Sequence, residues 1–162
     1  MMEDLIGYIS NYEIGDKERL QWNDLFAAVT KLFSLRSSCS KTRQSCLLIK
    51  DNRIISVGGN GAPSGTINCM EDGGEEVCGK DSSGSCFLGI HAEANAIGYA
   101  ARNGINTEGC IIYCTMTPCI SCAKLVVAAG IKEFHYIEEY RIDDGLRFLE
   151  YCDVPAWKIK TQ

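Results

Sequence analysis

The spacing of apolar residues changes along the chain and predicts where helices and strands lie. From Glu18, apolar residues recur at intervals of three and four, which is typical of a helix with one buried face: Trp22, Leu25, Phe26, Val29, Leu32 and Phe33. We expect this helix to end near Ser37-Ser38. Short apolar runs at 46–49 and 54–57 flank Lys50-Asp51-Asn52-Arg53, where Asp and Asn favour a tight turn, so this region is predicted to be a β-hairpin.

The second half of the chain alternates between helical and extended patterns. We predict helices at about 91–103, 118–129 and 143–151, and strands at 110–115, 132–138 and 156–160. Strands separated by helices indicate a three-layer α/β domain. No internal repeat is found, so residues 1–162 are interpreted as a single domain with an N-terminal extension at 1–17. A long polar loop at 66–88 is of the kind that is usually functional or held in place.

Charge and cysteine content narrow the functional classes. The chain has 162 residues, with 16 Lys and Arg against 21 Asp and Glu, a net charge of −5. This negative net charge argues against binding to long nucleic acid, but it allows a single nucleotide as a ligand. No run of about 18 apolar residues occurs, so we expect no membrane partner and a cytoplasmic location. In a reducing compartment, the 10 cysteines point to metal binding or catalysis before disulfides.

Two short motifs contain residue types that bind zinc. His91-Ala92-Glu93 begins one predicted helix, and Thr117-Pro118-Cys119-Ile120-Ser121-Cys122 begins the next. In the second motif, Thr117 suits the N-cap and Pro118 the first helical position, so Cys119 and Cys122 share one face. The partial positive charge of a helix N-terminus favours their thiolates. Two sulfurs and one imidazole leave a tetrahedral zinc with an open position, the mark of a catalytic zinc.

Glu93 completes this arrangement, because a carboxylate two residues beyond a ligand can move protons over the open side of the metal. His-x-Glu followed by Pro-Cys-x-x-Cys is the signature of the zinc deaminases. Read alone, a Cys-x-x-Cys pair is also typical of redox proteins, and a single His is more often structural. The two motifs together favour zinc, since redox chemistry would leave Glu93 without a role.

Beyond these motifs, the chain resembles the deoxycytidylate (dCMP) deaminase family of the zinc-dependent cytidine/deoxycytidylate deaminase superfamily. The similarity runs from about Ser37 to Ile159. It includes Lys50 to Ser56, Asn60 to Gly65, Asn68-Cys69, Ala92 to Ile97, Cys122 to Ile131, Glu139-Tyr140 and Asp144-Gly145-Leu146. The resemblance implies a three-layer α/β/α cytidine-deaminase-like fold with a central mixed sheet of about five strands. It also implies hydrolytic deamination of dCMP to dUMP and ammonia, supplying dUMP for thymidylate synthesis.

The resemblance also implies roles for individual residues. The catalytic zinc, one per chain, is expected on His91, Cys119 and Cys122. Glu93 is then the general acid/base, protonating N3 of cytosine and the departing amine after a zinc-activated water attacks C4. The expected substrate-binding residues are Asn60, Ser64, Gly65, Ala92, Pro118 and Tyr140. Within this set, Asn60 contacts sugar and base, Ala92 and Pro118 frame the pyrimidine, and Tyr140 closes the monophosphate end. Without the resemblance, the glycine-rich run at 58–65 reads equally well as a plain loop.

A second, structural zinc is also expected. Relatives carry such a zinc on cysteines that match Cys39 and Cys69, and Cys78 and Cys86 would complete a closed four-cysteine site that anchors the long loop. The alternative is that Cys78 and Cys86 are plain loop thiols. The remaining cysteines, Cys46, Cys110, Cys114 and Cys152, lie among apolar residues and are predicted to be small core residues, and His135 is predicted to be structural.

Regulation and assembly are expected from the resemblance alone. Tyr99 and Arg102 match a region where relatives bind regulatory nucleotide between subunits, with dCTP activating, dTTP inhibiting and Mg accompanying the nucleotide. A solvated Arg at a helix C-terminus is the equally weighted alternative. A homo-oligomer, for example a hexamer, is expected. The chain departs from the family at Gly59, where an aromatic is common, and at Gln44-Ser45, where Val-Gly is common.

Three rival functions remain open. The first is deamination of another cytosine nucleotide or nucleoside: dCTP, CMP, deoxycytidine or a modified dCMP. A deaminase of bases in RNA or DNA shares the zinc signature but is expected to have a basic surface, which this acidic chain lacks. The third is a zinc protein that binds nucleotides without turning them over, and the presence of Glu93 argues against it.

Overall fold

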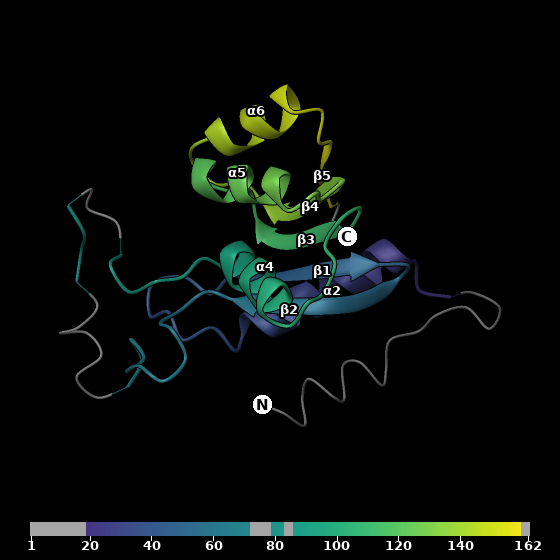
Figure 1. The fold of residues 1–162 in the computed structure, drawn as a ribbon. Coiled ribbons are helices and arrows are strands. Elements are labelled where there is room, and N and C mark those ends of the chain that lie inside the picture. The colour runs from purple at the N-terminus through teal and green to yellow at the C-terminus, as the bar shows by residue number, and fades with distance from the viewer. Residues whose placement is uncertain (1–18, 72–78, 83–85, 160–162) are drawn as a thin grey trace.

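The computed structural model describes residues 19–71, 79–82 and 86–159, and the structural statements below refer to these residues (Figure 1). The N-terminal extension predicted at 1–17 and the predicted zinc ligand Cys78 lie outside the described residues. Within the described part of the chain, no helix is both long enough and apolar enough to cross a membrane.

A five-stranded mixed sheet forms the middle layer, with the strand order β2-β1-β3-β4-β5. Strand β1 is antiparallel to β2 and β3, whereas β3, β4 and β5 are parallel to one another. The strands are β1 (Ser45–Lys50), β2 (Arg53–Gly59), β3 (Ile111–Met116), β4 (Glu133–Glu138) and β5 (Ala156–Lys158). The predicted mixed sheet is therefore confirmed, although the last strand is shorter than expected.

The predicted hairpin is formed by β1 and β2. Its two turn residues, Asp51 and Asn52, have φ angles of 50° and 56°. Positive φ at both central positions is the geometry that matches the twist of a two-residue hairpin, and Asp and Asn are among the few residues that tolerate it. The local sequence thus sets the register that brings the end of β2 beside the start of β1.

Helices cover both faces of the sheet. The helices are α2 (Trp22–Ser34), α4 (Ala92–Arg102), α5 (Ile120–Ala128) and α6 (Asp144–Tyr151). Figure 1 shows α2 on one face, where Phe26 packs with Leu47, Ile49 and Tyr113. The larger core lies on the other face and includes side chains from α4, α5 and α6. This is the three-layer arrangement that the sequence predicts.

The first helix differs from its prediction in length and burial. It ends at Ser34, not near Ser37-Ser38, because the next three backbone N–H groups bond to carbonyls only three residues back. Phe26 is buried, but Trp22, Leu32 and Phe33 are exposed, so the apolar stripe is only partly covered in the single chain.

The start of α5 also differs from its prediction. Cys119, not Thr117, is the N-cap residue, and helical residues begin at Ile120. Thr117 is instead used outside the helix, where its hydroxyl oxygen accepts a hydrogen bond from the backbone N–H of Tyr140 at 2.8 Å. Pro118 precedes the N-cap, because the chain remains extended between β3 and α5.

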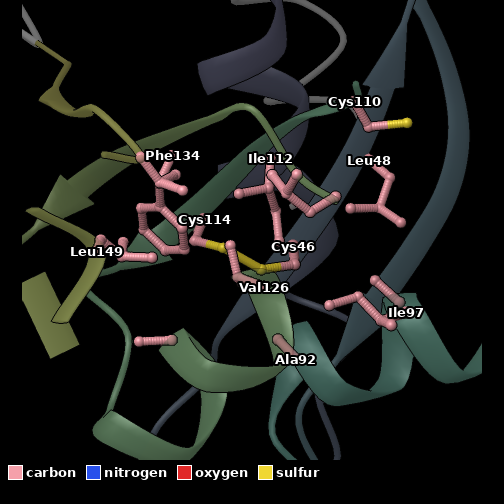
Figure 2. Close-up of a cluster of buried hydrophobic side chains, with 14 of the residues drawn as sticks. Cys46, Leu48, Ala92, Ile97, Cys110, Ile112, Cys114, Val126, Phe134 and Leu149 are labelled. Carbon is pink, nitrogen blue, oxygen red and sulfur yellow. A yellow bond between two sulfur atoms is a disulfide. The ribbon is translucent and has the colours of Figure 1, made fainter. Parts of the chain in front are cut away.

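Two predicted core cysteines are covalently joined. A disulfide links Cys46 of β1 to Cys114 of β3, which are direct partners in the antiparallel ladder (Figure 2). Interpreting them as separate core residues was therefore wrong, although both are buried. Cys110 is buried as predicted, whereas Cys152 is the half-buried C-cap of α6.

A glycine allows α4 to lie directly against β2. A Cβ atom on Gly58 would stand 2.1 Å from the carbonyl oxygen of Ala92 and 2.5 Å from the backbone nitrogen of Ala96. These atoms belong to helix backbone, so they cannot rotate away from a larger side chain. Gly58 therefore fixes how closely the beginning of α4 approaches the sheet.

We expect Gly58→Ala to lower the free energy of unfolding by about 3 kcal/mol, because α4 must move outward to admit the methyl group. Gly98→Ala is the matched control: it also adds a methyl group at α4, but it meets no atom within 4 Å. It should raise stability by about 0.5–1 kcal/mol through helix propensity. Urea unfolding measures both values, and equal stability of the two variants would contradict the close contact at Gly58.

Candidate active site

The predicted zinc ligands come together where two helices begin. His91 is the N-cap of α4, Cys119 is the N-cap of α5, and Cys122 lies in the first turn of α5. Neither N-cap residue makes a side-chain capping hydrogen bond. The N–H groups of both helix starts therefore contribute partial positive charge to the same place, which favours thiolate and other anionic groups there.

The geometry of these side chains fits a tetrahedral zinc ion. The Nδ1 atom of His91 lies 3.5 Å from Sγ of Cys119 and 3.4 Å from Sγ of Cys122. Zinc bonds of about 2.3 Å to sulfur and about 2.0 Å to nitrogen, at a tetrahedral angle, place these atoms roughly 3.5 Å apart. Among the described residues, this is the group whose possible ligand atoms all lie within 4.8 Å of one another.

The electrostatics of the cluster also suit a metal. Hydrogen bonds from Cys122 and His91 lower the pKa of the Cys119 thiol to about 3. The pKa of Cys122 is raised, because its thiol donates to Cys119 and is buried. The hydrogen bond to Cys119 raises the pKa of His91. The lowered pKa favours the thiolate form of Cys119, the form of cysteine that binds zinc.

Glu93 lies beside the ligands, on the second residue of α4. Its side chain is only 8% exposed, and burial raises the pKa of its carboxyl. A raised pKa makes a carboxyl a better proton acceptor and leaves it able to donate that proton again, as general acid/base catalysis requires. Glu93 thus lies beside the cluster as a buried carboxyl, and its role as general acid/base stays a prediction.

His91, Cys119 and Glu93 line a cavity of about 220 Å³, and Cys122 is buried behind them. Three of the predicted substrate-binding residues, Asn60, Ala92 and Tyr140, line it as well. Pro118 is fully buried between two lining residues. In contrast, Ser64 and Gly65 are exposed and lie outside the lining.

The sequence did not predict the polar side of this cavity, which is formed by Thr42, Gln44, Ser45, Thr115 and Thr117. The side chain of Gln44 donates to the hydroxyl of Thr42 at 2.7 Å and accepts from the hydroxyl of Thr115. The only available signal was the departure from the family at Gln44-Ser45.

Asn60 holds the loop before β1 in position. Its Oδ1 atom accepts hydrogen bonds from the backbone N–H of Gln44, at 2.7 Å, and from the hydroxyl of Ser37. Its Nδ2 atom donates to the carbonyl oxygen of Thr42 at 3.0 Å. Asn60 therefore supports one wall of the cavity in addition to lining it.

The loop that carries Cys119 is held from the other side by α6. A Cβ atom on Gly145 would stand 1.9 Å from the carbonyl oxygen of Pro118. The first turn of α6 thus touches the backbone between β3 and α5. The bond from Tyr140 to Thr117 ties the segment before α6 to the same loop.

The other predicted sites are not assembled in this way. Cys69 is buried and Cys39 and Cys86 are half-buried, but the described residues do not bring these three together as a ligand group. Tyr99 and Arg102 lie near the end of α4, where the guanidinium carbon of Arg102 is 6.0 Å from the ring centre of Tyr99. His135 is buried, and its ring stacks on Tyr113, in agreement with a structural role.

The sequence pattern described as "Cytidine and deoxycytidylate deaminase zinc-binding region" matches residues 20–138. The chain belongs to the cytidine and deoxycytidylate deaminase family. It is 37% identical to ComE operon protein 2 of Bacillus subtilis over 76% of this chain and 63% of the relative. It is also 37% identical to the deoxycytidylate deaminase of Schizosaccharomyces pombe, over 77% of this chain and 39% of the relative. The matches thus span less than two thirds of either of these relatives.

A solved structure within this deaminase family is similar in fold. The dCMP deaminase of cyanophage S-TIM5, crystallised with dCMP and dUMP, aligns with a TM-score of 0.75 and 30% sequence identity. The alignment covers 88% of this chain and 99% of the phage protein. This similarity confirms the predicted cytidine-deaminase-like fold over nearly the whole of that protein.

We expect Cys122→Ala to reduce bound zinc by about one ion per chain, because a tetrahedral site that loses a protein ligand binds the metal weakly. Cys110→Ala is the matched control, since Cys110 is equally buried but lies outside the ligand group. Zinc content is measured by elemental analysis of the purified variants. A wild-type zinc content in Cys122→Ala would contradict the assignment of the site.

Proposed function

We propose that this protein is a zinc-dependent deaminase that converts dCMP and water to dUMP and ammonia. The observation that carries this proposal is the buried carboxyl of Glu93, which lines the same cavity as His91 and Cys119 of the three-residue cluster. The similarity to a phage dCMP deaminase crystallised with dCMP and dUMP supports the choice of substrate. The product dUMP would supply thymidylate synthesis.

Zinc on His91, Cys119 and Cys122 would supply a water molecule of lowered pKa. Glu93 accepts the proton of that water and delivers it to N3 of the cytosine ring. It then transfers a proton to the amino group at C4, which leaves as ammonia. The reaction balances as dCMP plus water to dUMP plus ammonia. The burial of Glu93 maintains a raised pKa, so the carboxyl can act in both directions.

The remaining walls of the cavity would orient the nucleotide. The first N–H groups of α4, beginning at Ala92, have no intrahelical acceptor and are suited to the carbonyl oxygen of the pyrimidine. Asn60 and Tyr140 both line the cavity, where Asn60 would contact the sugar and base and Tyr140 would close the phosphate end. Ser64 and Gly65 remain candidates for phosphate contacts from the exposed loop beside the cavity.

The proposal is tested by ammonia release from the zinc-loaded protein, with the product identified by chromatography. Deoxycytidine, dCMP, CMP and dCTP are supplied separately. Turnover that prefers dCMP supports the proposal. Turnover of another compound in this panel would support zinc-dependent deamination but would assign a different substrate. Nucleotide binding without any ammonia release would identify a binding protein instead.

Glu93→Gln should reduce kcat by about 10³-fold, because the amide cannot carry the proton between water and base. Its zinc content should equal that of the wild type, since Glu93 is not a ligand. Glu150→Gln, an exposed change of the same kind on α6, should retain wild-type kcat. Wild-type turnover by Glu93→Gln would exclude the proposed mechanism.

We also propose a structural zinc on Cys39, Cys69, Cys78 and Cys86. The burial of Cys69 in a loop rich in polar residues supports this site. Cys69→Ser should lose this zinc while it retains the zinc on Cys119 and Cys122. Elemental analysis measures the zinc content per chain, and an unchanged zinc content in Cys69→Ser would contradict the proposed second site.

Regulation and assembly extend the proposal. We infer a homo-oligomer, such as a hexamer, in which dCTP with Mg activates and dTTP inhibits near Tyr99 and Arg102. The exposure of Trp22, Leu32 and Phe33 on α2 supports association of chains. Light scattering measures the assembly, and adding each nucleotide to the deamination assay measures regulation. An active monomer whose rate of deamination is the same with and without dCTP or dTTP would contradict the proposed assembly and regulation.

A further inference from the structure

The disulfide between Cys46 and Cys114 forms part of the cavity wall. Both cysteines line the cavity that also contains Glu93 and His91. They are nevertheless almost without solvent exposure, at 0% for Cys46 and 2% for Cys114. Figure 2 shows the bond crossing between the two strands within the larger core. The mechanism proposed above does not use this bond.

The disulfide joins two sides of the cavity that polar contacts also connect. On the β1 side, Cys46 follows Gln44 and Ser45, and on the β3 side Cys114 precedes Thr115. The backbone N–H of Ser45 donates to the hydroxyl oxygen of Thr115 at 3.1 Å, and Thr115 donates to Gln44. The positions of these polar groups in the cavity therefore depend on the spacing of β1 and β3 at the disulfide.

Reduction changes the space that the sulfur atoms occupy. Bonded sulfurs lie about 2 Å apart, whereas two thiols separate to non-bonded contact. The core on one side of the pair is closely packed, so the separating sulfurs move toward the cavity that the pair also lines. The strands, or the side chains beside them in the cavity, must therefore shift when the bond is reduced.

We propose that Cys46 and Cys114 are a redox couple in the wall of the nucleotide cavity, whose disulfide form binds the nucleotide more tightly than its dithiol form. The identity of the nucleotide rests on the proposed function. Both residues line the cavity, but their side chains have almost no solvent exposure. A small reductant therefore reaches the bond only when this wall opens, and a bound nucleotide covers the same wall.

The exchange is balanced by a dithiol reductant. One thiolate of the reductant attacks a cystine sulfur, which releases one protein thiolate and forms a mixed disulfide. The second thiolate of the reductant then attacks the reductant's own sulfur in that mixed disulfide and releases the other protein thiolate. Two electrons pass to the cystine, and two protons complete the thiols of Cys46 and Cys114. The reductant becomes a cyclic disulfide. A small-molecule disulfide restores the bond by the reverse exchange.

The bond itself is tested by peptide mapping of zinc-loaded protein purified without reductant and treated with an alkylating agent. Trypsin cleaves after Arg43 and Lys50, so Cys46 lies in the peptide at 44–50 and Cys114 in the peptide at 103–124. We expect these two peptides to be linked. If alkylated Cys46 appears instead, even after treatment with a small disulfide, the proposal is overturned.

The effect on binding is tested with a water-soluble phosphine, which reduces a disulfide by taking up the oxygen of water and adds no thiol to compete for zinc. We expect the KM for dCMP to rise about tenfold as the linked peptide disappears, since a shift of about 1 Å in a site can have effects of that size or larger. Zinc content should stay constant. An unchanged KM after complete reduction refutes the proposal.

Variants separate this pair from the zinc-binding cysteines. In Cys46→Ala the KM should be the same with and without phosphine, whereas Cys110→Ala should respond as the wild type does. Cys114→Ala replaces Cys46→Ala if the latter does not fold. If phosphine raises the KM of Cys46→Ala as much as that of the wild type, the effect comes from other cysteines and the proposal is refuted. Linked peptides without any dCMP turnover would refute the proposed function instead.

Discussion

The site depends on the convergence of two helix N-termini beyond the carboxyl end of β3. Helices α4 and α5 begin with His91 and Cys119, and these ligand residues occupy the positions where other helices place a capping side chain. The uncapped N–H groups favour negative charge, and the cluster provides it as thiolate. The same helix N–H groups that lack a capping side chain therefore stabilise the negative charge of the zinc-binding cluster. The cavity lies beyond the carboxyl end of β3, where an open α/β sheet usually binds its ligand.

Two glycines maintain that convergence from outside the cavity. Gly58 allows the backbone of β2 to meet the first turns of α4, and Gly145 allows α6 to meet the carbonyl of Pro118. Each contact is between backbone atoms, so it cannot adapt through a change of rotamer. Close packing of β2 against α4, and of α6 against the loop before Cys119, therefore helps to hold His91 and Cys119 at their distance.

The sequence predicted that His91, Cys119 and Cys122 come together near Glu93 because each motif is local, and a helix start places nearby residues in a known relation. The alternation of elements predicted the three-layer α/β domain, and the family resemblance predicted its mixed sheet of about five strands. The sequence analysis missed the disulfide because Cys46 and Cys114 are 68 residues apart and meet only through the register of β1 and β3. For the same reason it missed the pairing of Gln44 with Thr115. The two-residue error at α5 arose because Thr117 bonds to Tyr140, a distant partner that outweighed its local preference as a cap.

The two ends of the loop between β2 and α4 are paired with each other next to the sheet. Gly61 and Ile90 exchange two backbone hydrogen bonds, of 3.2 Å and 2.9 Å, immediately before His91. This pair closes the segment 62–89 at its base, so the position of the first ligand does not depend on how that segment runs. A segment of different length between Gly61 and Ile90 would leave His91 beside Cys119 and Cys122, although it would lack the second zinc site proposed above. The fold therefore has a natural insertion point, where new recognition elements can be added beside an unchanged reaction centre.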